Sequence, residues 1–83
     1  MIYSGNLNDF RRAHDRIRSL GFSLENETWK SMRTRTHATR YIIRLSTNEH
    51  IVSPTFDHYD EDVQCNNITA WLNKQADALE SWK

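Results

Sequence analysis

The apolar residues of this chain change their spacing twice along the sequence, and this change limits the folds open to it. An N-terminal set recurs every three or four residues, the spacing of one helix face, and consists of Leu7, Phe10, Ala13, Ile17 and Leu20. A C-terminal set has the same spacing and consists of Ile68, Trp71, Leu72, Gln75, Leu79 and Trp82. The pattern predicts one helix at each end of the chain and a different structure between them.

The expected helix ends carry residues that suit them. Ser4 or Asn6 can cap the first helix, and Gly21 can adopt the left-handed conformation that often ends one. The acidic residues 60–62 lie where the start of the last helix favours negative charge. Polar residues occupy the faces opposite the two apolar stripes, among them Arg16 on the first helix and Asn66, Asn73, Asp77 and Glu80 on the last.

The middle of the chain is typical of β-structure. Strands are predicted at residues 29–34, 39–46 and 50–56, with Pro54 bending or ending the third. In the second strand, Tyr41 and Ile43 point to one face, while Arg40 and Arg44 point to the other. Short connections favour antiparallel pairing. We therefore predict an α+β fold of order α-β-β-β-α in a single domain over residues 1–83, with both helices on one face of a three-stranded antiparallel sheet.

Length and composition exclude several classes of protein. The chain has 83 residues, two glycines and one cysteine, so a disulfide framework, a cysteine-based zinc site and a phosphate-binding glycine loop are not expected. Four histidines lack metal-ligand spacing, and the sequence predicts no cofactor, metal or catalytic residue. No apolar run approaches the roughly 18 residues of a membrane span, which favours a cytoplasmic protein without membrane contact.

Charge is balanced overall but not along the chain. Eleven basic and eleven acidic residues argue against a strongly cationic nucleic-acid-binding protein and against an acidic DNA mimic. Residues 1–44 nevertheless hold nine of the basic and four of the acidic residues, which leaves residues 45–83 strongly acidic. The two halves either complement each other within the fold or form two surfaces that meet different partners.

Two charged sets are candidates for partner binding. The acidic set comprises Asp57, Asp60, Glu61 and Asp62. It would dock on a basic partner, or else complement the dipole of the last helix. The basic set comprises Arg33, Arg35, Arg40 and Arg44. It would bind phosphate or an acidic rim, or else form a solvated strand face.

The predicted element order resembles the double-stranded-RNA-binding fold and, within it, ribonuclease toxins of the HicA type. The similarity covers Leu20-Gly21-Phe22, Thr36-His37 and Ser53-Pro54. It implies an RNA-binding or RNA-cleaving domain, in which the basic set would hold phosphate and His37 would match the catalytic histidine of the toxins.

The chain also resembles small phage-encoded inhibitors of host defence, of the anti-CRISPR type. The similarity rests on size, on the absence of a cofactor motif, and on the acidic turn that leads into the Trp71-Leu72 helix. It implies a non-enzymatic protein that binds and blocks a large host protein or nucleoprotein complex. We take this inhibitor as the first functional hypothesis, with the RNA-binding domain second and a self-associating structural domain third.

Overall fold

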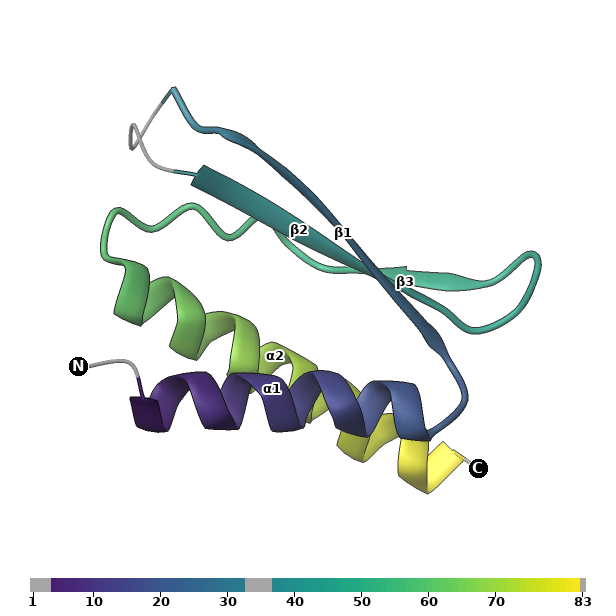
Figure 1. Cartoon of the computed structure of the whole chain (residues 1–83). Helices are drawn as coiled ribbons and strands as arrows, with labels where there is room; N and C mark the ends of the chain where they lie inside the picture. The colour runs from purple at the N-terminus through teal and green to yellow at the C-terminus, as the bar shows by residue number, and fades with distance from the viewer. Residues whose placement is uncertain (1–3, 33–36, 83) are drawn as a thin grey trace.

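The computed structural model describes residues 4–32 and 37–82, and within them two helices pack on one face of a three-stranded sheet (Figure 1). The sheet is antiparallel, with strands in the order β1-β2-β3. This arrangement confirms the predicted α+β fold and its element order. The elements are α1 (Ser4–Ser19), β1 (Ser23–Lys30), β2 (His37–Arg44), β3 (His50–Val52) and α2 (Glu61–Trp82).

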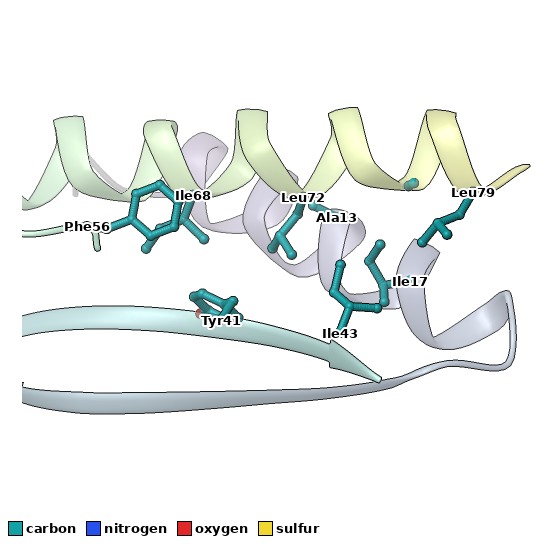
Figure 2. Close-up of a cluster of buried hydrophobic side chains, with 9 residues drawn as sticks. Ala13, Ile17, Tyr41, Ile43, Phe56, Ile68, Leu72 and Leu79 are labelled. Carbon is teal, nitrogen blue, oxygen red and sulfur yellow. The ribbon is translucent and has the colours of Figure 1, made fainter. Parts of the chain in front are cut away.

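The hydrophobic core lies between the sheet and the two helices (Figure 2). Its centre holds Ile17 from α1, Ile43 from β2 and Leu72 from α2, all with no exposed surface. Burying each of these side chains contributes roughly 1.5–3 kcal/mol. The inward face of β2 and most of both helical stripes were therefore predicted correctly, although Leu7 is exposed. The Trp82 side chain of the second stripe lies outside the described residues.

Helix α1 ends as its sequence predicts but begins earlier than one of the proposed caps. Gly21 has a φ of 92°, the left-handed conformation that glycine adopts without strain, and its N–H donates to the Arg18 carbonyl at 2.9 Å. The helix already includes Ser4, so Asn6 lies inside its first turn and cannot be the cap.

The first strand lies earlier in the chain than predicted. It begins at Ser23 rather than residue 29, and the end predicted for it, residue 34, falls outside the described residues. Residues 25–27 have low β-propensity, yet they form a strand because β1 pairs with β2 along its whole length, from Ser23 opposite Arg44 to Lys30 opposite His37. Strand β2 begins two residues before the predicted position 39 and ends two before position 46, at Arg44.

The third strand is shorter than residues 50–56 and ends at Val52, although the Ser53 N–H still donates to the Tyr41 carbonyl at 2.8 Å. Beyond it, the hydroxyl of Ser53 accepts from the Tyr41 N–H at 2.8 Å and donates to the Pro54 carbonyl at 2.8 Å. The chain meets β2 again at Phe56, whose N–H donates to the Thr39 carbonyl at 2.8 Å. Pro54, which has no N–H, lies in the gap.

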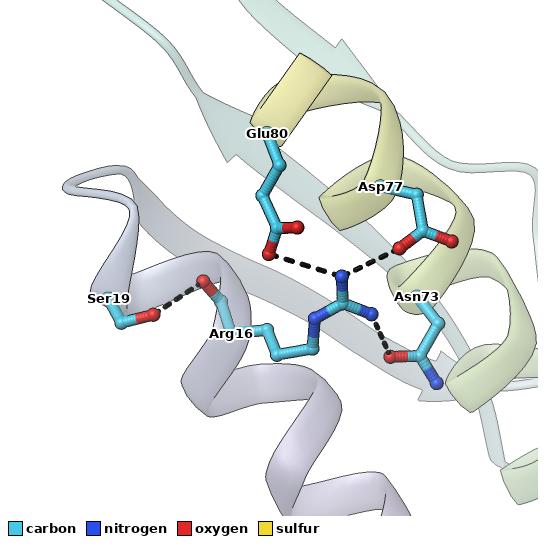
Figure 3. Close-up of polar contacts among 5 residues, drawn as sticks. All are labelled: Arg16, Ser19, Asn73, Asp77 and Glu80. Atoms are coloured by element: carbon cyan, nitrogen blue, oxygen red, sulfur yellow. Dashed lines mark hydrogen bonds and ion pairs between the residues drawn. The ribbon is translucent and has the colours of Figure 1, made fainter. Parts of the chain in front are cut away.

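A polar cluster joins the two helices (Figure 3). The guanidinium of Arg16 donates to Asn73 at 3.0 Å, to Asp77 at 2.6 Å and to Glu80 at 3.1 Å. The sequence predicts these residues on the polar faces of the two helices, and Asp77 and Glu80 are well exposed there. The long arginine side chain reaches them across the edge of the helix pair. Here the basic and acidic halves of the chain do complement each other.

In residues 4–32 and 37–82, neither helix has an apolar stretch long enough to span a bilayer.

Candidate partner-binding site

The basic set is only partly described by the structure. Arg33 and Arg35 lie outside the described residues. Arg40 and Arg44 alternate along β2 with the buried Tyr41 and Ile43, so they lie on the sheet face away from the helices, as predicted, but each has an acidic neighbour on β1. The Arg40 guanidinium donates to the Glu27 carboxylate at 2.7 Å, and Arg44 forms an ion pair with Glu25. These glutamates offset much of the positive charge on this face.

The acidic set lies at the start of α2. Asp60 is the N-cap: its carboxylate accepts from the backbone N–H of Asp62 at 2.9 Å and of Val63 at 3.3 Å. Glu61 and Asp62 occupy the first helical turn, where negative charge is favoured. Asp57 accepts from the Ser31 hydroxyl at 3.5 Å. The structure therefore brings the four acidic residues to one end of the molecule, and Asp60 has a structural role there.

Both helices begin at this end of the molecule (Figure 1). Several exposed apolar side chains belong to residues near it. Met32, beyond β1, is 90% exposed, and Tyr59, just before α2, is 73% exposed. Leu7 and Val63, near the starts of α1 and α2, are also exposed. The Tyr59 ring stacks on His58 with 4.6 Å between ring centroids. Exposed aromatic side chains of this kind are frequent anchors in protein interfaces.

A pocket of about 250 Å³ opens between the first turns of the two helices. Its lining comes from both helices, from the start of β2 and from the loop before α2: Leu7, Phe10, His37, His58, Glu61, Gln64, Cys65 and Ile68. A second hollow of about 160 Å³ lies beside it and shares His58 and Gln64. The pocket thus adjoins the acidic set, since Glu61 belongs to both.

Gln64 is held in one orientation at the wall of the pocket. Its side-chain nitrogen donates to the backbone carbonyl of His37 at 3.1 Å. A carbonyl can only accept, so the amide nitrogen must face His37 and the amide oxygen must face away. That oxygen, Oε1, is buried and has no hydrogen-bond partner among the residues that the structure describes. A buried acceptor without a donor is energetically unfavourable and marks a place where a donor would be stabilised.

Two further titratable residues line the pocket, Cys65 and His37. Burial raises the pKa of the Cys65 thiol, which keeps it protonated at neutral pH. His37 contributes its backbone carbonyl to Gln64, and its side chain is exposed at the start of β2. In the described part of the chain, no three or more His, Cys, Asp or Glu side chains come together as a metal ion requires.

Sequence reasoning missed two residues of this end. Tyr59 could have been found, because it lies between predicted elements and outside both apolar stripes, which favours exposure. Gln64 gave no such signal, because its contact with His37 spans 27 positions and depends on how α2 packs beside β2.

Comparison with known proteins finds a match over the whole chain. The model of the family described as "Bacteriophage T7-like, gene 1.2" matches residues 1–83. A protein of Escherichia phage T7 named "Inhibitor of dGTPase" is 37% identical over 82 residues, which cover 99% of this chain and 96% of the relative. The "Gene 1.2 protein" of Enterobacteria phage T3 is 36% identical over 87 residues, covering 99% of this chain and 95% of the relative.

Proposed function

This chain belongs to the bacteriophage T7-like gene 1.2 family, and from that membership we propose that it inhibits a dGTPase of the bacterial host by binding to the enzyme. The observation that carries the proposal is the 37% identity with the T7 inhibitor, which extends over nearly the full length of both chains. The relative has no additional domain that could hold the inhibitory surface, so the α-β-β-β-α domain must hold it there.

Membership of this family supports the inhibitor hypothesis over the RNA-binding hypothesis. A phage-encoded, non-enzymatic inhibitor agrees with the name of the T7 relative. The narrower anti-CRISPR expectation has no support, because neither the matching family nor its relatives are described in that way. The RNA-binding and RNA-cleaving alternative has none either, nor has a nucleoprotein complex as the target. The partner is accordingly a host protein, and the proposal makes that protein an enzyme.

We place the contact with the enzyme at the end where both helices begin. A dGTPase binds a triphosphate, and groups that bind a polyanion are cationic, so its substrate site presents positive charge. The acidic set Asp57, Asp60, Glu61 and Asp62 is complementary to such a surface. Met32 and Tyr59 beside it supply apolar contact area, which charged rims alone do not provide.

The basic set has a smaller role in this proposal. Arg40 and Arg44 are already paired with glutamates of β1, so docking through them would first break those ion pairs. Contact of Arg33, Arg35, Arg40 and Arg44 with an acidic rim of the partner stays a prediction.

The proposal is tested with purified dGTPase from an Escherichia host. We expect the chain to lower the rate of dGTP hydrolysis in a saturable manner and to elute with the enzyme in size-exclusion chromatography. The thermally unfolded chain is the control. Undiminished hydrolysis together with separate elution would contradict the proposal.

A further inference from the structure

We propose that the free edge of β1 receives an extended segment of the inhibited enzyme as a fourth strand of the sheet, with basic side chains of that segment opposite Glu25 and Glu27. That the segment belongs to the enzyme rests on the proposed function. The chemistry of the edge does not, because it follows from the way in which β1 pairs with β2.

The two edges of the sheet differ in how well they can accept another strand. The strand order β1-β2-β3 places β1 at one edge and β3 at the other. Strand β3 has three residues, and Pro54, which has no N–H, follows it closely. Strand β1 has eight residues in unbroken register with β2, and all of them except Leu24 are exposed. A long open edge of this kind can pair with an extended segment of another chain.

The hydrogen bonds of β2 show which backbone groups of β1 are open. Thr39 exchanges both of its backbone hydrogen bonds with the segment after β3, so its neighbour Arg40 directs its own backbone groups towards β1. Glu27 lies opposite Arg40 and pairs with it. Asn26 and Thr28, on either side of Glu27, therefore direct their N–H and carbonyl groups to the free edge. In the described part of the chain, no hydrogen bond reaches these backbone groups.

The glutamates of β1 select the charge of the added strand. The side chains of Glu25 and Glu27 are 49% and 51% exposed on the sheet face away from the helices. Each carboxylate meets an arginine on its β2 side, and the added strand would lie on its other side. Opposite charges directly across neighbouring strands stabilise a sheet, whereas like charges destabilise it. The added strand should therefore carry basic residues two positions apart, since alternate residues share a face.

A second copy of this chain fits the edge less well than a basic segment. Two β1 strands in antiparallel pairing must bring their open backbone groups together, which limits the possible registers. The two registers of greatest overlap place Asn26 opposite Asn26 or Glu27 opposite Glu27 of the other copy. The first of them also places Glu25 opposite the Glu27 of the other copy. Both registers put like charges directly across from each other, so the glutamates oppose self-pairing.

The edge is continuous with the contact surface proposed above. Met32 lies two residues beyond the end of β1, and Ser31 between them donates to Asp57 of the acidic set at 3.5 Å. Trp29 alternates with the two glutamates, so it lies on the same face, and it is 40% exposed. An apolar residue of the added strand can pack on its ring. The edge and the acidic set can therefore bind one enzyme at the same time.

The first test needs no enzyme. The probe is the peptide acetyl-Thr-Val-Thr-Lys-Thr-Lys-Thr-amide, which in an antiparallel strand places valine opposite Trp29 and lysines opposite Glu27 and Glu25. The matched control peptide has glutamate in place of both lysines. In an NMR titration, the lysine peptide should shift the amide signals of Asn26 and Thr28 with a dissociation constant of about 1–10 mM, and the glutamate peptide should not. Equal shifts with both peptides, or none with either, would overturn the inference.

A change in the backbone separates strand pairing from attraction between charges. N-methylation of the two central threonines of the lysine peptide removes N–H groups that face β1 and keeps both lysines, so it should abolish the shifts. Asn26→Pro removes an open N–H of β1 at an edge position, where proline is tolerated, and Asn26→Ala, which keeps that N–H, is the matched control. If Asn26→Pro does not fold, the methylated peptide decides. Unchanged binding of the methylated peptide would show that no strand is added.

The second test uses the enzyme. Hydrogen exchange at the N–H groups of Asn26 and Thr28, followed by mass spectrometry, should slow at least about tenfold in the complex. Asn26→Pro should weaken inhibition at least about tenfold relative to Asn26→Ala. If the wild-type chain inhibits but neither effect occurs, the edge assignment is wrong and the proposed function stands. If the wild-type chain does not bind the enzyme, the proposed function is wrong, and the peptide titration alone decides on the edge.

Two further results bear on the occupant. The double variant Glu25→Gln, Glu27→Gln should weaken inhibition at least about tenfold, whereas Asp15→Asn, Glu49→Gln, which removes the same charge elsewhere, should inhibit almost as well as the wild type. Equal losses in the two double variants would overturn the selection of basic residues. A dimer of the free chain that Asn26→Pro converts to a monomer would make a second copy the occupant and would overturn the inference.

Discussion

The guanidinium of Arg16 on α1 lies 2.6 Å from the carboxylate of Asp77 on α2, although the two residues are 61 positions apart in the chain. The same nitrogen is 3.1 Å from Glu80. The hydrogen bonds to Asp77 and Glu80 raise the pKa of the guanidinium above its ordinary value, which favours the charged form of Arg16. The basic half of the sequence is thereby connected to the acidic half at one edge of the helix pair.

We predict that Arg16→Met lowers the stability of the fold only modestly and removes part of its salt dependence. Both carboxylates are well exposed, and exposed ion pairs are screened by salt. In urea unfolding at low and high NaCl, added salt should lower the free energy of unfolding less in the variant than in the wild type. Arg12→Met on the exposed side of α1 is the control. Identical salt responses of wild type and Arg16→Met would contradict the prediction.

Two neighbouring isoleucines of β2 should differ sharply in their contribution to stability. Ile43 is fully buried against the helices, whereas Ile42 points to the uncovered face and is half-buried. Ile43→Ala should reduce the free energy of unfolding by about 2–5 kcal/mol, and Ile42→Ala by clearly less. Chemical denaturation measures both. If Ile43→Ala does not fold, Ile43→Val should cost about 0.5–1.5 kcal/mol. Equal losses at the two positions would show that the face assignment is wrong.

The acidic set should matter for inhibition through its position and not through net charge alone. The double variant Glu61→Gln, Asp62→Asn leaves the Asp60 cap intact and should weaken inhibition of dGTPase at least about tenfold. The control double variant Asp15→Asn, Glu49→Gln removes the same charge from exposed positions elsewhere. It should inhibit almost as well as the wild type. If both double variants lose inhibition to a similar extent, the acidic residues act through long-range electrostatic steering and not through contact.

Cys65 should react slowly with alkylating reagents in the folded chain. Burial raises the pKa of its thiol, and only the thiolate is a strong nucleophile, so the reactive fraction at neutral pH is smaller than in an exposed cysteine. Iodoacetamide labelling at pH 7.5 should therefore be slower in the native chain than in the same chain unfolded in urea. Labelling at the same rate in both states would contradict the burial of this thiol.

Alkaline pH should destabilise the fold through Tyr41. Burial raises the pKa of its phenol in the folded state above the value of about 10 in the unfolded state. The unfolded chain therefore loses this proton first, so the stabilisation is complete below about pH 10 and is lost as the pH rises towards the folded pKa. In Tyr41→Phe the free energy of unfolding should decrease less as the pH rises above about 10. Tyr59→Phe, at an exposed position, should behave like the wild type.

The same variant has a separate effect at neutral pH. The Tyr41 hydroxyl lies 3.2 Å from the Nε2 of His14, whose Nδ1 donates to the Phe10 carbonyl at 2.7 Å. Tyr41→Phe removes this bond between β2 and α1 and should reduce the free energy of unfolding by about 1 kcal/mol at pH 7. Urea unfolding across the pH range measures both effects in one series. If the free energy of unfolding of Tyr41→Phe still falls at alkaline pH as in the wild type, another group causes that fall.

Local patterns in the chain were enough to predict both helices, the inward face of β2 and the capping region of α2. The apolar spacing around Ile17 and around Leu72 indicates which helix face is buried, because removing apolar surface from water is favourable. The cap at Asp60 and the turn at Gly21 depend on backbone groups a few residues away. Such features need no knowledge of distant segments.

Tertiary contacts alone decided where β1 begins, which charges are neutralised and where the pocket forms. Glu25 and Glu27 have weak strand propensity, and they lie in a strand because β2 offers its backbone and the arginines Arg40 and Arg44 alongside. Gln64 meets the His37 carbonyl, and the pocket forms, because α2 starts beside His37 and α1 starts beside α2. Which distant side chains come into contact depends on how the helices pack on the sheet. The spacing of residues within one helix or strand does not determine that packing.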